Sequence, residues 1–175
     1  MKKLKSNEIK TITIDEFKKC KKNPIVIVLD NIRSALNVGS IFRTADTFLV
    51  DKILLCGITA YPPHKDIRKS ALDADSSVNW EYYSNTVDAV NTLINKNYNI
   101  LSVEQTSKSI SLDKVKLPEI PVALVFGNEV NGVSQEVINL SAVSIKIPQL
   151  GTKHSLNVSV AAGIVIWKIY ELINN

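Results

Sequence analysis

Residues 25–29 read Ile25-Val26-Ile27-Val28-Leu29, an unbroken apolar run of mostly β-branched side chains that follows Asn23-Pro24. A run without polar alternation is typical of a strand that is buried on both faces of a sheet. Similar runs predict strands at residues 52–56, 78–83, 99–103, 121–126 and 143–147, and helical patterns lie between them at 38–47, 87–95 and 134–139. Because strands alternate with helices, we predict an α/β fold with a mostly parallel sheet flanked by helices.

The composition is that of one globular domain with a basic start. The chain has 175 residues, of which 45% are hydrophobic and 22% charged, enough apolar material for a single core. Residues 1–22 hold eight lysines and three acidic residues, a balance of +5, so the other 153 residues sum to −1. We therefore predict a basic N-terminal segment at 1–22 and one domain at 23–175. Such a segment can attract a polyanion such as nucleic acid, or alternatively form a solvated lysine-rich helix.

Several classes of protein are excluded by the residue pattern. The lysine-rich start has no apolar stretch of the kind found in secretory signals, so a cytoplasmic protein is expected. Cys20 and Cys56 form no CxxC pair, and His64 and His154 lie far apart in the sequence. We therefore expect neither a metal site nor a disulfide framework.

Two more helices are predicted, one near each end of the chain. Thr13-Ile14-Asp15-Glu16 has the form of a capping box and predicts a short helix at about 14–19. Residues 156–173 are apolar almost all round, so a helix there must be buried on more than one side. Polar residues interrupt this stretch, which excludes a membrane span. We expect an interface between two copies of the chain, with Gly163 allowing close approach, and a central helix within one monomer is the alternative.

Three segments place polar or glycine residues where a buried strand ends, and this is the edge at which open α/β sheets bind ligands. The first segment, residues 30–46, offers Asn37 as the expected cap of a helix. It also carries Arg33 and Arg43, whose planar guanidinium groups match a phosphate. A surface salt bridge is the alternative role for Arg43.

The second segment, residues 125–134, places Glu129 between Gly127 and Gly132. Such a loop is tight enough for its backbone to approach a ligand. No Gly-Lys-Ser/Thr follows, and GxGxxG is absent from the chain, so this is not a phosphate-binding loop of a known kind. A plain turn before a helix capped by Ser134 is the alternative.

The third segment, residues 147–159, is a polar glycine-containing loop that leads into the final helix. Ser155 has the side chain of a helix cap. Asn157 is expected just inside a buried helix, where its amide must find hydrogen-bond partners or cost free energy. Both side chains are therefore candidates for a site.

Together the three segments resemble the motifs of the SpoU (TrmH-like) class of SPOUT methyltransferases. The motifs read Asn37-x-Gly39-x-x-x-Arg43-Thr44-Ala45, Phe126-Gly127-Asn128-Glu129-x-x-Gly132-x-Ser134 and Ile147-Pro148-x-x-Gly151-x-x-x-Ser155-Leu156-Asn157-Val158-Ser159-Val160-Ala161. They occur in the family's order, and the similarity spans residues 24–173. The resemblance implies an S-adenosylmethionine-dependent enzyme that methylates a ribose 2′-hydroxyl in tRNA or rRNA.

The resemblance also implies a fold and a set of site residues. The C-terminal part of the α/β domain is expected to form a trefoil knot, the protein to be a homodimer, and the cofactor to lie within the knot. The implied cofactor contacts are Gly127, Ile147 and Leu156, with the strand end at residues 103–105 as another wall. The implied catalytic residues are Asn37, Arg43, Glu129, Ser155 and Asn157.

We assign Arg43 to the target phosphate and the 2′-oxygen, with Asn37 and Ser155 in support. Glu129 and Asn157 are expected to order the loops around them. Although an arginine in this position has been proposed as a general base in the family, a guanidinium holds its proton tightly, so an electrostatic role is preferred.

One departure and two alternatives accompany this assignment. Relatives often carry Ala-Leu-Gly-Ala where this chain has Ala71-Leu72-Asp73-Ala74, so we expect an altered turn there. A knotted methyltransferase that acts on a base is one alternative function, and an RNA-binding module without activity is the other.

Overall fold

A computed structural model of the chain describes residues 1–5, 8–116 and 120–174. The described elements are, in order, α1 (Ile14–Lys19), β1 (Asn23–Asp30), α2 (Ala35–Thr47), β2 (Val50–Cys56), α3 (Lys65–Ala71), α4 (Ala74–Ser77), β3 (Asn79–Tyr83), α5 (Thr86–Asn95), β4 (Asn99–Val103), β5 (Ile110–Ser111), the 3₁₀ turn η2 (Leu112–Lys114), β6 (Val122–Gly127), α6 (Gln135–Leu140), β7 (Val143–Lys146) and α7 (Val158–Asn174).

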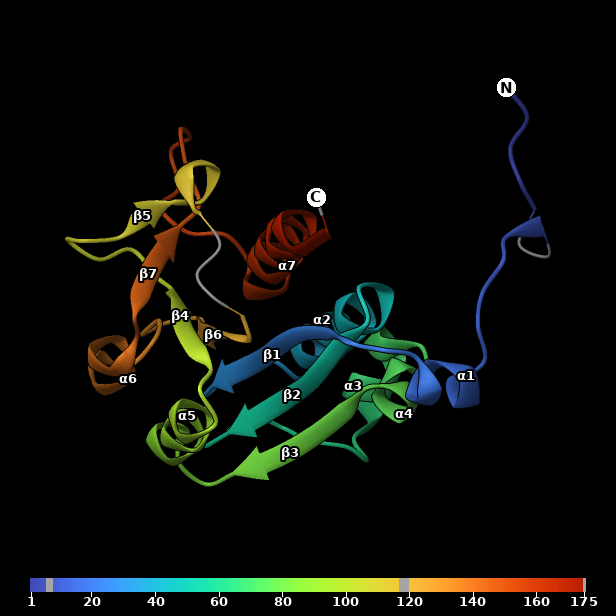
Figure 1. Cartoon of the computed structure of the whole chain (residues 1–175), viewed down its shortest axis with the longest axis horizontal. Coiled ribbons are helices and arrows are strands. Elements are labelled where there is room, and N and C mark those ends of the chain that lie inside the picture. Colours follow the sequence, from blue (N-terminus) through green and yellow to red (C-terminus); the bar gives the residue numbers. More distant parts are fainter. Residues whose placement is uncertain (6–7, 117–119, 175) are drawn as a thin grey trace.

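The strands of the described residues form one seven-stranded sheet in the order β3-β2-β1-β6-β4-β7-β5. Every pairing between these strands is parallel. The prediction of an α/β fold with a mostly parallel sheet is therefore confirmed (Figure 1). Because all strands run the same way, their carboxyl ends lie along one edge of the sheet, where the connections to the following helices begin.

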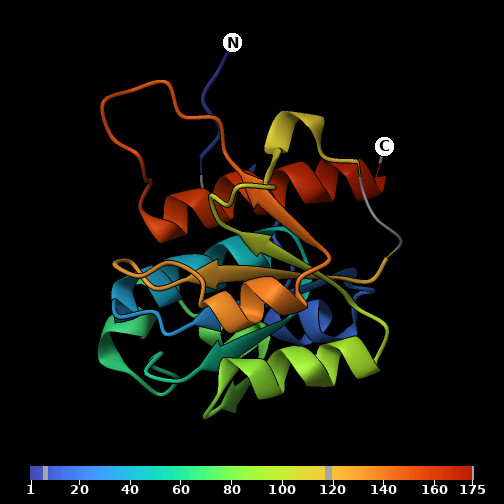
Figure 2. The same ribbon diagram turned by 90° about the vertical axis from the view of Figure 1, so that its left-hand side faces the viewer.

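The sheet is covered on both faces, as the central run of residues 25–29 predicts. Each of these residues is at most 1% exposed. Ile25, Ile27 and Leu29 belong to a core that also includes α2, α3 and α7, whereas Val26 and Val28 pack with α5 and α6. This alternation follows from the two-residue period of a strand. Figure 2 shows α7 along one side of the sheet and α5 along the other.

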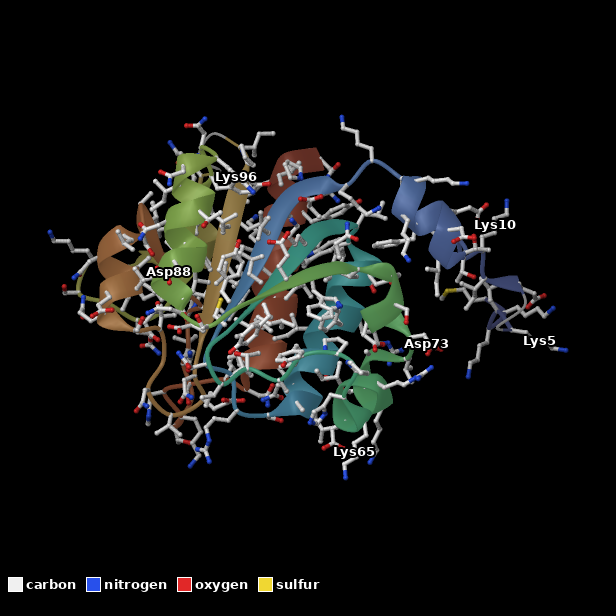
Figure 3. The ribbon with its side chains drawn as sticks, turned by 90° about the horizontal axis from the view of Figure 1, so that it is seen from below. Lys5, Lys10, Lys65, Asp73, Asp88 and Lys96 are labelled. Carbon is white, nitrogen blue, oxygen red and sulfur yellow. The ribbon has the colours of Figure 1, made fainter. Side chains whose placement is uncertain are left out.

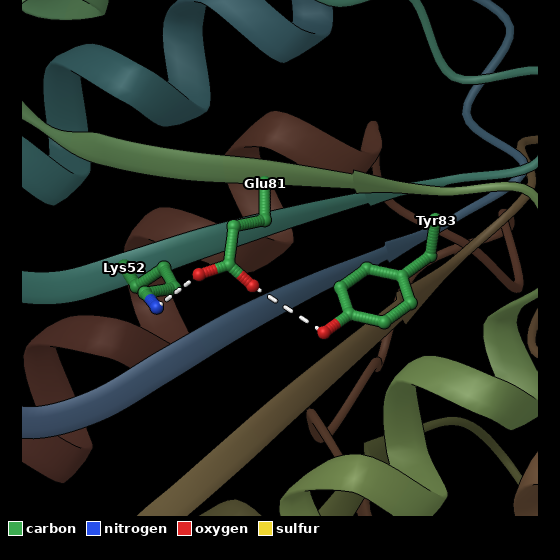
Figure 4. A network of polar contacts seen from close by, with 3 residues as sticks. All are labelled: Lys52, Glu81 and Tyr83. Carbon is green, nitrogen blue, oxygen red and sulfur yellow. Dashed lines mark hydrogen bonds and ion pairs between the residues drawn. The ribbon is translucent and has the colours of Figure 1, made fainter.

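The edge strand β3 is tied to β2 by polar side chains on the sheet face that carries α5 (Figure 4). Lys52 of β2 forms an ion pair with Glu81 of β3, and the Tyr83 hydroxyl donates to Glu81 Oε2 at 3.3 Å. The hydrogen bond with Lys52 lowers the pKa of Glu81. Because both side chains are partly exposed, this pair adds little to stability and mainly sets the position of the edge strand.

Most predicted elements are present, with ends that differ by a few residues. The capping box is confirmed, because Thr13 Oγ1 accepts from the Glu16 N–H and the Glu16 carboxylate accepts from the Thr13 N–H. The short helices α3 and α4 and strand β5 were not predicted. Helices of four to seven residues carry too few periodic apolar positions to be recognised in a sequence.

The turn between α3 and α4 uses Leu72 at φ +51° and Asp73 at φ +70°. Glycine adopts this left-handed region without strain, and aspartate tolerates it better than most residues do. Asp73 therefore occupies a backbone conformation that glycine would adopt without strain.

Two predicted helix caps are wrong. The first residue of α2 is Ala35, and its cap is Ser34, whose Oγ accepts from the Asn37 N–H at 3.4 Å. The final helix begins at Val158, and Asn157 caps it in place of the predicted Ser155, because its Oδ1 accepts from the Ser159 N–H at 2.9 Å. Asn157 is therefore exposed at the helix start and not inside a buried helix.

Helix α7 buries only one of its apolar faces in this chain. Ile166 and Ile169 are fully buried in the main core, so they are not surface positions available for an interface. The opposite face carries Val160, Ile164 and Trp167, which are 51%, 39% and 53% exposed. Apart from the neighbouring backbone of α7 itself, no described atom lies within 4 Å of the place where a Cβ at Gly163 would lie. The helix therefore leaves an apolar stripe open to solvent.

Both cysteines are free thiols, and Cys56 is buried at the end of β2. Burial raises the pKa of the Cys56 thiol to about 12, so this group is an unreactive core residue. Among the described residues, no group of three or more histidine, cysteine or carboxylate side chains lies close enough together to hold a metal ion. No helix in the same residues is long and apolar enough to cross a membrane.

Candidate active site

A cavity of about 680 Å³ opens at the carboxyl ends of β4, β6 and β7, the sheet edge at which the sequence places its polar segments. Its walls come from the three strand ends, the loops that follow β6 and β7, and the first turn of α7. The lining residues are Val103, Glu104, Gln105, Phe126, Gly127, Asn128, Glu129, Val130, Asn131, Gly132, Ile145, Lys146, Ile147, Gln149, His154, Ser155, Leu156, Asn157, Val158 and Ala161.

The cavity brings together most of the predicted site residues. The expected cofactor contacts Gly127, Ile147 and Leu156 all line it. Of the expected catalytic residues, Glu129, Ser155 and Asn157 line it as well. Asn37 and Arg43 are not part of this wall.

Glu129 is held by donors from the segment that follows β1. Its Oε2 accepts from the Arg33 N–H at 2.8 Å, and its Oε1 accepts from the Ser34 N–H at 3.1 Å and from Asn37 Nδ2 at 3.0 Å. Burial acts to raise the pKa of Glu129, but these hydrogen bonds outweigh it and leave the pKa below its ordinary value. At neutral pH this residue is therefore a fixed carboxylate that anchors two loops and is not a proton donor.

Asn37 joins the three motifs. Its Nδ2 donates to Glu129, and its Oδ1 accepts from Asn157 Nδ2 at 3.1 Å. Asn157 Oδ1 already accepts from the Ser159 N–H in the first turn of α7, so the amide nitrogen of Asn157 points toward Asn37. The chain of contacts from Asn157 through Asn37 to Glu129 links residues that are 92 and 120 positions apart.

Glu104 and Gln105 hold the two loops of the cavity through their side chains. Glu104 Oε2 accepts from the Val133 N–H at 3.0 Å, and Gln105 Nε2 donates to the His154 carbonyl at 2.6 Å. Gly132 has φ +67°, and a Cβ there would lie 2.1 Å from Glu104 Oε2, so only glycine suits this position. The sequence predicts this strand end as a wall, and the polar pair directly after an apolar strand is the signal for its bracing role.

Asp30 supports the site in a role that the sequence interpretation missed. It ends β1 and is 1% exposed, and its carboxylate accepts from Thr86 Oγ1 at 2.6 Å, Asn31 Nδ2 at 2.8 Å and the Ser134 N–H at 3.0 Å. A buried charge needs such partners. Asp30 therefore fixes the start of α6, immediately after the Glu129 loop. The available signal was an acidic residue at the end of an all-apolar strand.

Arg43 lies elsewhere on α2. It is exposed and lines a second cavity of about 370 Å³, together with Ile14 and Phe17 of α1 and with Asp73. Arg43 is six residues beyond Asn37, which corresponds to about 9 Å along the helix axis. Within one chain, Arg43 and Ser155 therefore face different cavities.

The geometry agrees with a match to a family model. The model described as the SpoU rRNA Methylase family matches residues 24–167. The chain belongs to the SpoU rRNA methylase family. The match includes all three polar segments and the strands that carry them, so this SpoU family member has the family's domain over most of its length.

Two curated relatives are similar to this SpoU family member over most of the chain. A protein of Borreliella burgdorferi named as an uncharacterized tRNA/rRNA methyltransferase is 31% identical over 176 residues, which cover 97% of this chain and 76% of that protein. The tRNA (guanosine(18)-2′-O)-methyltransferase of Aquifex aeolicus is 28% identical over 150 residues, which cover 82% of this chain and 67% of the enzyme.

A solved structure shows the same fold. The rRNA methyltransferase of Sinorhizobium meliloti, crystallised with AdoMet bound, superposes with a TM-score of 0.82 at 23% identity. The superposition covers 91% of this chain and 61% of that one, so the present chain spans about three fifths of the length of that enzyme.

Proposed function

We propose that this chain transfers a methyl group from S-adenosylmethionine to a ribose 2′-hydroxyl of tRNA or rRNA. The observation that carries the proposal is the network from Asn157 through Asn37 to Glu129, which joins the three motifs beside one cavity. Membership of the SpoU family and the similarity to a tRNA 2′-O-methyltransferase support the choice of reaction.

The cavity suits the proposed cofactor in size and lining. Its volume of about 680 Å³ lies within the range of small-molecule sites. The strand end at Gly127 and the loop residues Ile147 and Leu156 present backbone groups and apolar side chains, which we propose hold the cofactor. Bound there, S-adenosylmethionine would supply an electrophilic methyl group. The Sinorhizobium meliloti rRNA methyltransferase, which has the same fold, was crystallised with AdoMet bound, and this supports the assignment.

The protein's own contribution is placement and charge. Methyl transfer needs an aligned hydroxyl and stabilisation of the negative oxygen that develops. We propose that Ser155 and the fixed amide of Asn157 lie beside the target ribose, while Glu129 keeps their loop in place. Arg43 faces a separate cavity, and this placement favours a contact with an RNA phosphate over one with the reacting oxygen.

A second copy of the chain is the proposed occupant of the exposed face of α7. Val160, Ile164 and Trp167 form an apolar stripe beside Gly163, where there is open space for another backbone. Ile164→Asp should yield monomers by light scattering, whereas Lys168→Gln on the same helix should not. Soluble dimers of Ile164→Asp would show that the interface lies elsewhere.

Three further assignments stay predictions. We propose that the segment from β6 to α7 forms the trefoil knot of the family, which the position of β6 between β1 and β4 in the sheet supports. The division into a basic segment at 1–22 and a domain at 23–175 and the cytoplasmic location are also retained.

Incubation of the purified protein with methyl-labelled S-adenosylmethionine and total RNA tests the function. We expect label in RNA and, after digestion, mass spectra that place the methyl group on ribose. Nucleosides methylated on the base would identify a base methyltransferase instead. RNA that is bound but never labelled would identify a binding module.

A further inference from the structure

Three aromatic rings gather at the edge strand β3 and the loop after β2, outside the cavity described above. Tyr61 lies in the loop after β2, and its ring stacks on Trp80 of β3 with centroids 6.1 Å apart and an interplanar angle of 26°. The Tyr61 and Tyr82 rings are 4.9 Å apart. Tyr61 is 49% exposed and Tyr82 44% exposed. Tyr61 therefore contacts both other rings, and Tyr61 and Tyr82 are half open to solvent.

A series of hydrogen bonds connects these rings to the loops of the candidate active site. The Tyr82 hydroxyl donates to the Gly57 carbonyl at 3.0 Å, and the Ile58 N–H donates to Asn31 Oδ1 at 3.2 Å. The Asn31 carbonyl in turn accepts from Asn128 Nδ2 at 2.7 Å, next to Glu129. Two strand spacings, about 10 Å, separate β3 from β1, whose end leads to Asn37. The rings are therefore held at a set position relative to the active site.

Two exposed lysines lie on the helix that follows the Tyr61 loop. Helix α3 begins four residues after Tyr61, and Lys65 and Lys69, one turn apart on it, are both exposed. Beyond α3 lies α1, which follows the lysine-rich start of the chain and shares the second cavity with the end of α3. Figure 3 shows Lys5 and Lys10 at one end of the molecule and Lys65 at a neighbouring margin, with Asp73 between them. The lysines nearest to the rings in the chain are therefore Lys65 and Lys69 of α3.

We propose that Tyr61 and Tyr82 are a stacking platform for unpaired bases of the RNA substrate, with Lys65 and Lys69 on its phosphates. This inference rests on the proposed function. Exposed aromatic rings beside cations suit single-stranded RNA, because every base offers a face for stacking. The interior of a protein interface is, by contrast, depleted of lysine. The platform would place nucleotides that flank the methylated ribose.

Fluorescence anisotropy with two labelled probes tests the platform in the full-length protein. One probe is a twelve-nucleotide oligoadenylate, and the other is an abasic ribose-phosphate chain of equal length. Tyr61→Ala and Tyr82→Ala should each weaken oligoadenylate binding by about tenfold and leave the abasic probe unaffected. Tyr61→Phe, which keeps the ring, should bind both probes as the wild type does. Lys65→Gln should weaken both probes and reduce the salt dependence by about one ion.

The possible results separate this inference from the proposed function, because probe binding does not require methyl transfer. Calorimetric titration with S-adenosylmethionine checks that each variant keeps its fold and cofactor cavity. Equal oligoadenylate binding by Tyr61→Ala, Tyr82→Ala and the wild type would overturn the platform. Loss of self-association in these variants without a change in RNA binding would assign the rings to protein contact and overturn it too. If either result were found while the wild-type enzyme methylated RNA, the platform would be refuted and the proposed function would be retained.

Discussion

Replacing Glu129 with glutamine is the most direct test of the network that joins the motifs. The substitution keeps the shape of the side chain and removes its charge. A glutamine oxygen in the place of Oε1 can still accept from the Ser34 N–H and from Asn37, but its NH₂ group then faces the Arg33 N–H, and that hydrogen bond is lost. One hydrogen bond to a charged group in a solvent-accessible loop is worth about 1–2 kcal/mol. We therefore expect kcat/KM for methyl transfer to fall about 5- to 30-fold.

The assay is the initial rate of methyl transfer to RNA at varied cofactor concentration. Glu136→Gln is the matched control, because Glu136 is an exposed carboxylate on the neighbouring helix α6. It should retain the wild-type rate. The reasoning would be refuted if Glu129→Gln kept kcat/KM within twofold of the wild type, since a carboxylate that orders the loop cannot be replaced without cost.

The other predictions concern four positions. Arg43→Ala should leave S-adenosylmethionine binding nearly intact by calorimetry and lower kcat/KM for RNA about 10- to 100-fold, mainly through a higher KM for RNA, because one charged contact with a phosphate is lost. An unchanged KM for RNA would remove Arg43 from the RNA contact. Glu104→Gln should raise KM for the cofactor about five- to tenfold with a smaller change in kcat, because the Val133 N–H loses a charged acceptor; an unchanged KM would refute the bracing role. Asp73→Gly should relieve the strain of a φ of +70° and stabilise the protein by about 1 kcal/mol, which corresponds to a rise of about 2–4 °C in Tm. Thermal unfolding followed by circular dichroism would detect this rise, and a lower Tm would show that the aspartate is needed. Because the pKa of Glu129 is depressed, its stabilising contribution is present above the ordinary glutamate pKa and disappears only as pH falls through the depressed value. We therefore expect the Tm difference between the wild type and Glu129→Gln to be constant near neutral pH and to shrink in acid. A difference that shrinks toward neutral pH would contradict this.

The elements that the sequence predicts well are those with local signals. Residues 25–29 form β1 because an apolar β-branched run favours a buried strand in almost any surroundings. The helix at Ile14–Lys19 follows from a capping box that spans four residues. The caps predicted at Asn37 and Ser155 were wrong because Ser, Asn and Asp are nearly equivalent as caps, and only the path of the chain selects Ser34 and Asn157.

The residue types of the site follow from the motifs, but their grouping does not. The motifs supply Glu129, Ser155 and Asn157 as well as Arg43. Only the structure shows that the first three line one cavity and that Arg43 lines another. Side chains 92 and 120 positions apart meet through Asn37 only after the parallel strands have aligned their carboxyl ends.

Hydrophobic pattern and spacing alone therefore specify the class of fold, the strands at its centre and the candidate residues, because these depend on interactions between near neighbours in the chain. Tertiary packing alone decides which face of α7 is inside, since Ile164 and Ile166 are chemically equal and differ only in whether the sheet lies beside them. It also decides that Glu104 braces the Gly132 loop and that Tyr61 and Tyr82 stand half exposed at the sheet edge. Such contacts join segments distant in sequence, and their free energy exists only once the core has brought the strands together.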